Sequence, residues 1–115
     1  MKSALFLITS DPLANGRAVE GLRIAAGVQG WQSLRVRVFL DDVVARALAS
    51  SADGLEEDAL IRQCLPMLGQ GDTPILVGES HLAGLSGEDW EAIFAAVDKR
   101  RLAQLAAESN WVLHF

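Results

Sequence analysis

The chain has little of the chemistry that supports disulfides, metal sites or redox reactions. Its 115 residues include one cysteine, Cys64, and two histidines, His81 and His114. A single cysteine excludes both an internal disulfide and a CxxC redox pair. Structural zinc sites use four cysteine or histidine ligands, which these residues do not supply. We therefore expect neither a metal nor a cofactor.

Excess positive charge and long apolar runs are also missing. The net charge is -5 and the isoelectric point is about 4.8, so the basic triplet 99–101 is interpreted as a solvated helix face. No apolar run approaches the roughly 18 residues of a membrane-spanning helix. The first residues contain one lysine, Lys2, and no small-residue cleavage site, so no signal peptide is evident. We expect one cytoplasmic domain, residues 1–115, that binds neither nucleic acid nor membrane.

What the chain does have is an alternation of strand-like and helix-like segments. Half of the residues are hydrophobic, which suffices for a core in one domain of this length. Near the start, Ala18, Leu22 and Ala25 recur at helical spacing between two β-type runs. We expect Gly27 and Gly30 to stop this helix. The predicted strands are 5–8, 34–40, 73–77, 93–97 and 111–115, and the predicted helices are 17–25, 43–48, 53–68 and 99–108, the last capped by Asp98.

This alternation predicts the fold class and the edge where function is expected. Strands and helices joined by short connections form a three-layer α/β/α sandwich, here with a mostly parallel sheet of about five strands. The assignment of the fourth strand is left open, because Glu91 and Ala92 equally suit a longer helix. Ligands of open parallel sheets bind where the strands end. The residues at the predicted strand exits, which form the candidate crevice, are Ser10, Asp11, Arg17, Asp41, Gly78, Glu79, Ser80 and His81.

Four segments, taken in order along the chain, carry a resemblance to a known family. They are RAVEGLR at 17–23, VFLDDV at 38–43, ILV at 75–77 with Leu82 and Gly84-Leu85 behind it, and the ending from Leu102 through WVLHF at 111–115. In this combination the chain resembles the DsrE/DsrF/DsrH family of sulfur-relay proteins, also named TusD, TusC and TusB. The resemblance implies an α/β sandwich that forms homo-oligomers or mixed hexamers. It also implies a role in passing persulfide sulfur toward tRNA thiolation or sulfur oxidation.

The residue after the third strand departs from this family. Its persulfide-carrying members have a cysteine there, in the form V-C-x-x-S/C-L, whereas this chain has VGESHL at 77–82, with Gly78 in that position. Glycine has no thiolate to attack a persulfide. Together with the ending at 107–115, this implies a non-catalytic subunit closest to the DsrF/TusC branch. Such a subunit acts by assembly, in a homo-oligomer or in a hetero-oligomer with DsrE- or DsrH-like subunits.

The lone thiol could be a displaced carrier, but its position favours the core. Cys64 lies on an apolar helical stripe between Ile61 and Leu65. A thiol buried in apolar surroundings behaves as a small hydrophobic group and is inert. Loss of sulfur acceptance in a Cys64→Ser variant would instead identify it as a relocated carrier.

The loop 79–81 admits a hydrolase hypothesis and a simpler one. His81 could transfer a proton or bind an anion, since histidine titrates near neutral pH. Ser80, His81 and Glu79 could also form a triad, yet the members of a triad normally come from separate segments. The simpler interpretation is an exposed loop histidine, and His114 is expected to be a strand residue that reaches a surface edge.

The remaining polar residues support a second hypothesis, a stand-alone domain that binds a small ligand or an anion. Asp41 and Asp42 could hold a metal, although they equally suit a helix cap. The loop 10–16 could hold an anion on its free amides, with Arg17 as the nearby charge, or it could simply supply turn geometry. Trp111, like the two other tryptophans, could anchor an interface or fill the margin of the core.

Overall fold

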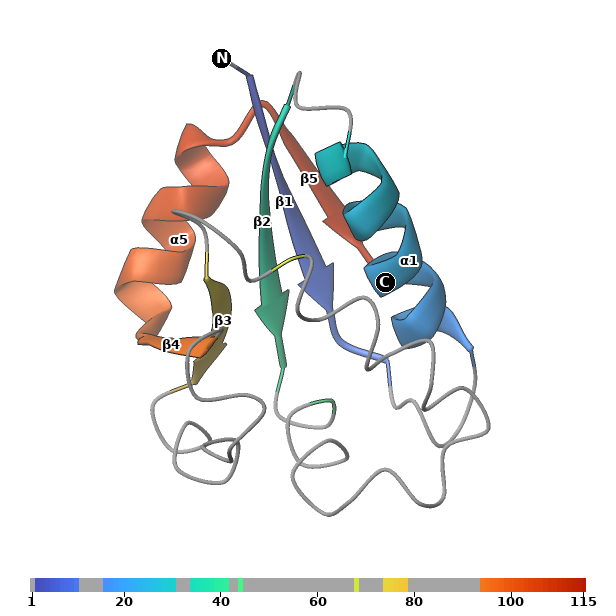
Figure 1. Cartoon of the computed structure of the whole chain (residues 1–115). Coiled ribbons are helices and arrows are strands. Elements are labelled where there is room, and N and C mark those ends of the chain that lie inside the picture. Colours follow the sequence, from blue (N-terminus) through green and yellow to red (C-terminus); the bar gives the residue numbers. More distant parts are fainter. Residues whose placement is uncertain are drawn as a thin grey trace.

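The computed structural model describes residues 2–10, 16–30, 34–41, 44, 68, 74–78 and 94–115. In this part of the chain, five parallel strands form one sheet in the order β4-β3-β2-β1-β5 (Figure 1). The sheet confirms the predicted α/β class. The elements are β1 (Ser3–Ile8), α1 (Arg17–Gly30), β2 (Arg35–Leu40), β3 (Ile75–Gly78), β4 (Phe94–Val97), α5 (Lys99–Glu108) and β5 (Trp111–His114).

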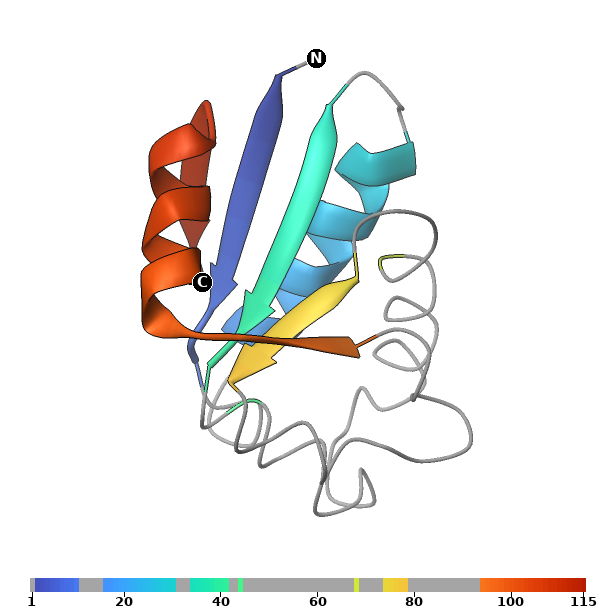
Figure 2. The ribbon, with the colours of Figure 1, turned by 90° about the vertical axis from the view of Figure 1, so that its left-hand side faces the viewer.

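Helices α1 and α5 cover opposite faces of this sheet, and the strand sequences reflect it (Figure 2). In β1, Phe6 and Ile8 point toward α1, whereas Leu5 belongs to the cluster under α5. A parallel sheet with both faces covered carries near-continuous apolar strands. This explains why β1 is a run of hydrophobic residues without polar alternation.

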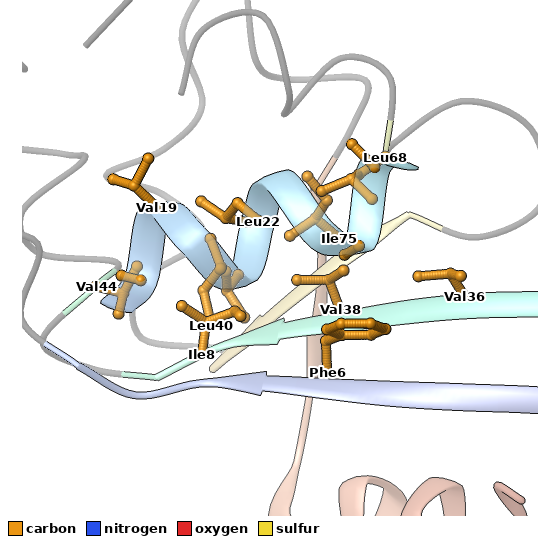
Figure 3. Close-up of a cluster of buried hydrophobic side chains, with 14 of the residues drawn as sticks. Phe6, Ile8, Val19, Leu22, Val36, Val38, Leu40, Val44, Leu68 and Ile75 are labelled. Carbon is orange, nitrogen blue, oxygen red and sulfur yellow. The ribbon is translucent and has the colours of Figure 1, made fainter. Parts of the chain in front are cut away.

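The larger part of the core lies between α1 and the sheet (Figure 3). Ala18, Leu22 and Ala25 have relative exposures of 0 to 1% and face strands β1 and β2. Full burial of one large aliphatic side chain contributes about 1.5–3 kcal/mol, so this face of α1 is a major source of stability. The predicted inward stripe of α1 is confirmed.

The helix α1 ends at Gly30, as expected, but Gly27 does not stop it, so the predicted range 17–25 is too short. Gly27 lies exposed on the solvent side, and its position for a Cβ is open space. A glycine inside a helix costs about 1 kcal/mol relative to alanine. The burial of Ala25 and Ala26, together with partly buried Val28, outweighs this local cost.

The C-terminal elements agree with the sequence-based expectations. The carboxylate of Asp98 accepts a hydrogen bond from the backbone N–H of Arg101 at 2.7 Å, so Asp98 caps α5 as predicted. Leu105 is buried under α5, with Leu102 beside it. Segment 94–97 is a strand, which settles the open alternative in favour of β4.

The third strand differs slightly from its predicted range of 73–77. Strand β3 begins at Ile75, directly after Pro74, and it includes Gly78 as its last residue. Val44 and Leu68 are helical and buried, as expected for the predicted helices around them. The rest of the predicted helices 43–48 and 53–68 lies outside the described residues. Within the described ranges, none of the helices is long and apolar enough to cross a membrane.

Candidate functional site

The carboxyl ends of β1, β2 and β3 meet at one edge of the sheet, as expected for parallel strands (Figure 1). Ser10 follows β1, Asp41 follows β2, and Gly78 is the last residue of β3. The backbone N–H of Asp41 donates to the carbonyl of Ile8 at 3.0 Å, which holds the exits of β1 and β2 side by side. Open parallel sheets bind ligands at this edge, so the candidate functional site is located here.

The last residue of the sequence forms a wall of this edge, which the sequence pattern did not predict. The carbonyl of Phe115 accepts hydrogen bonds from the backbone N–H groups of Thr9 at 3.2 Å and Ser10 at 3.1 Å. Its own N–H donates to the carbonyl of Leu7 at 2.8 Å. Its ring stacks on that of Phe6, with centroids 5.9 Å apart. Phe115 is therefore fixed at both its backbone and its ring.

An open depression lies between Phe115 and the start of α1. Its volume is about 460 Å³, and its described lining consists of Gly16, Arg17, Glu20 and Phe115. The carbonyl of Gly16 accepts the N–H of Glu20 at 3.0 Å, the first hydrogen bond of the helix. The depression thus combines a helix N-terminus and one arginine with one carboxylate. A helix N-terminus and an arginine both favour anionic groups.

The carboxylate of Glu20 is already engaged by a neighbour on the same helix. Arg23 forms an exposed ion pair with it, one turn further along α1. Exposed pairs of this spacing add little stability. Among the described lining residues, Arg17 is the other charged side chain beside Glu20.

Gly21, which lies between Glu20 and Arg23 in α1, sets how closely this helix approaches the sheet. A Cβ at this position would lie 2.7 Å from Ile8 Cδ1, 2.7 Å from Phe115 Cγ and 2.8 Å from Phe115 Cβ. Any larger residue would therefore push α1 away from Phe115. The RAVEGLR segment is thus explained mainly by packing: its buried glycine allows the close approach, and its other buried residues are Ala18, Val19 and Leu22.

A second polar contact at this edge joins residues far apart in the sequence. Thr9 Oγ1 lies 2.7 Å from His114 Nε2. Both side chains are accessible to solvent. His114 is exposed on β5, so its expected position at a surface edge is confirmed. The contact arises because β5 pairs with β1, a strand order that local sequence patterns do not reveal.

The described residues account for half of the candidate crevice. Ser10 and Arg17 are both placed next to Phe115, one by a hydrogen bond and one across the depression. Asp41 and Gly78 lie at the same sheet edge but do not line the depression. Residues Asp11, Glu79, Ser80 and His81, together with Asp42 and Cys64, lie outside the described part of the chain. Within the described ranges, no cluster of three potential metal ligands occurs.

Comparison with known proteins identifies the fold. No protein-family description matches the sequence, and no curated protein matches it. The crystal structure of the ychN protein from E. coli is similar over 100% of both chains, with a TM-score of 0.78 and 19% sequence identity. This agreement shows that the two chains share one fold from end to end. At this identity it says nothing further about activity.

Proposed function

We propose that this chain is a non-catalytic, DsrF/TusC-like subunit of a cytoplasmic sulfur-relay complex. It acts by assembling with a cysteine-bearing homologue. The observation that carries the proposal is Gly78. It ends β3 at the sheet edge, where persulfide carriers of the family that the sequence resembles have their cysteine. The fold shared with the ychN protein supports the same assignment.

The chemistry of persulfide transfer explains why Gly78 points to a structural role. A carrier must attack the donor persulfide with a thiolate. At the carrier position this chain offers only backbone. Around this position, backbone hydrogen bonds hold Phe115, Ser10 and Asp41 along the edge. We therefore expect this edge to contribute by contact with a partner and not by covalent chemistry.

Assembly is tested by mixing this protein with a DsrE-like protein that carries the V-C-x-x-S/C-L motif. Mass photometry or light scattering measures whether a mixed complex forms, and sulfur uptake is measured on each chain by intact mass spectrometry. We expect a mixed complex in which only the cysteine-bearing chain gains sulfur. A protein that ignores every carrier subunit would contradict the proposal.

A gain-of-function variant sharpens this test. Gly78→Cys places a thiol at the carrier position, on the face of β3 that Gly78 shares with Leu76 and that lies opposite the α1 core. If the edge keeps the geometry of a carrier, we expect this variant to accept a sulfur from a persulfide donor when the unaltered protein does not. Ala107→Cys, at an exposed position near the end of α5, is the matched control for adventitious thiol chemistry.

A second candidate function is binding of a small anion in the depression next to Phe115. Arg17, at the start of α1, favours it. Titration with inorganic phosphate, followed by calorimetry, would show saturable binding that is lost in Arg17→Gln. Arg35→Gln, an exposed change at the opposite end of β2, should have no effect. Equal binding by both variants would rule this function out.

A further inference from the structure

The exposed apolar surface of the described residues is concentrated on one strand. Trp111, Val112 and Leu113 have relative exposures of 49%, 46% and 37%, and they follow one another in β5. Strand β5 is the outermost strand on its side of the described sheet. Natural proteins usually protect such an edge with lysine, proline or a bulge, and WVLH contains neither residue. An edge of this kind marks an interaction surface.

The backbone of β5 shows which groups are free to pair at this edge. Phe115 directs both its N–H and its carbonyl toward β1. Backbone groups alternate in direction along a strand, so Leu113 and Trp111 also face β1. Val112 and His114 therefore direct their N–H and carbonyl groups outward. Asn110 ends this pattern, because its N–H donates to Ser3 on β1 at 2.9 Å.

We propose that β5 pairs in antiparallel fashion with β5 of a second copy, about a two-fold axis that passes through Leu113. An axis perpendicular to the sheet keeps the α1 face of one copy continuous with the α1 face of the other. With the axis at Leu113, Val112 of each copy lies opposite His114 of the other, and all outward backbone groups of both residues are paired. An axis at Val112 would instead set His114 against Asn110, whose N–H already faces inward.

The side chains agree with this register. Trp111 and Leu113 share the α1 face, since they pair with Ala4 and Phe6 of β1. Across the axis, Leu113 meets Leu113 of the second copy and Trp111 meets its Phe115. Aromatic and aliphatic cross-strand pairs stabilise antiparallel strands. No charged side chain occurs in β5 itself, and the ammonium group of Lys2 lies over the Trp111 ring, 5.5 Å from its centroid.

Pairing of β5 with β5 of a second copy fits better than head-to-tail pairing of β5 with β4. Pairing of β5 with the opposite edge strand, β4, would repeat without closing and would build filaments, whereas a two-fold contact closes as a dimer.

The surface area that the two-fold contact buries is small. A buried aromatic hides about 150–250 Å², so the half-exposed Trp111 and its two neighbours hide a few hundred Å² per copy. Stable interfaces bury at least about 1,200 Å² in total, so we expect a weak dimer with a micromolar dissociation constant.

The register is tested by crosslinking in a Cys64→Ser background. Residues at the axis of a non-hydrogen-bonded antiparallel pair have Cα atoms about 4.5 Å apart, a distance that a disulfide spans. Leu113→Cys is therefore expected to form a dimer on mild oxidation, whereas Val112→Cys, which lies opposite His114, forms it much more slowly. Faster crosslinking of Val112→Cys, or of neither variant, would overturn the register.

The surface itself is tested by sedimentation equilibrium on the full chain over a wide concentration range. Leu113→Lys places two positive charges opposite each other at the axis and is expected to weaken the dimer by about tenfold or more. Ala107→Lys adds the same charge to the exposed side of α5 and should leave the dimer unchanged. A strictly monomeric protein, or association that Leu113→Lys leaves intact, would refute the proposal.

This proposal adds a surface to the assembly that the proposed function requires, and the two fail separately. If the protein does not self-associate but still binds a cysteine-bearing homologue, the β5 contact is wrong and the proposed function stands. If it self-associates through β5 but ignores every carrier, the proposed function is wrong and the β5 contact stands.

Discussion

Two glycines on the same helix provide a sharp test of how α1 is packed. Gly21 faces Ile8 and Phe115, whereas Gly27 faces open space. Replacing either by alanine removes the cost of a helical glycine, about 0.5–1 kcal/mol. At Gly27 nothing opposes this gain. We therefore expect Gly27→Ala to raise the free energy of unfolding by about 0.5–1 kcal/mol.

At Gly21 the gain is opposed by steric overlap. The new methyl group would lie 2.7 Å from Ile8 Cδ1 and 2.7 Å from Phe115 Cγ. Ile8 can turn its terminal methyl away. Phe115 is held by backbone hydrogen bonds and by stacking on Phe6. Overpacking a core costs about 1–3 kcal/mol, so Gly21→Ala should be destabilising by up to about 2 kcal/mol.

The comparison of the two variants isolates this steric cost, because the helix-propensity gain is the same in both and cancels. Urea denaturation followed by far-UV circular dichroism measures both free energies, and equal m-values would show that the unfolded states are comparable. We expect Gly27→Ala to be more stable than Gly21→Ala by about 1–3 kcal/mol. For a chain of this size this corresponds to about 4 °C in Tm for each kcal/mol. Equal stability of the two variants would refute the close packing of α1 on Phe115.

Three further substitutions test other parts of the fold by the same denaturation assay. Asp98→Ala removes the cap of α5 and should cost about 1 kcal/mol, with a smaller loss in Asp98→Asn; no loss in either would contradict the cap. Leu22→Ala opens a cavity under α1 and should cost about 2–5 kcal/mol, and a loss below 1 kcal/mol would show that the core is looser than described. Glu20→Gln breaks only the exposed pair with Arg23 and should change stability by less than about 1 kcal/mol; a larger loss would mean that the pair has a structural role.

Local patterns in the sequence predicted most elements of the fold. The apolar run of β1, the helical spacing of Ala18, Leu22 and Ala25, and the cap at Asp98 are all local signals, and all are confirmed. Gly27 was misread because a local helix-stopping signal was outweighed by burial of the neighbouring residues. The order of the strands, with β5 beside β1, was not predictable, since it depends on pairing between the two ends of the chain.

The site was predicted less completely than the fold, for the same physical reason. In a parallel sheet the carboxyl ends of neighbouring strands lie at one edge, so the shared position of Ser10, Asp41 and Gly78 could be predicted from the sequence. The roles of Phe115 and Gly21 were not, because each depends on a contact between segments far apart in the chain. A hint existed in the glycine of RAVEGLR, which is a poor helix former at a central helical position.

Intact mass spectrometry after incubation with a persulfide donor shows whether this chain carries sulfur itself or serves only as a structural partner. The protein and its Cys64→Ser variant are compared, with folding checked by circular dichroism. We expect that neither folded protein gains the mass of a sulfur atom. A gain in the unaltered protein that disappears in Cys64→Ser would identify Cys64 as a carrier and would refute a purely structural role.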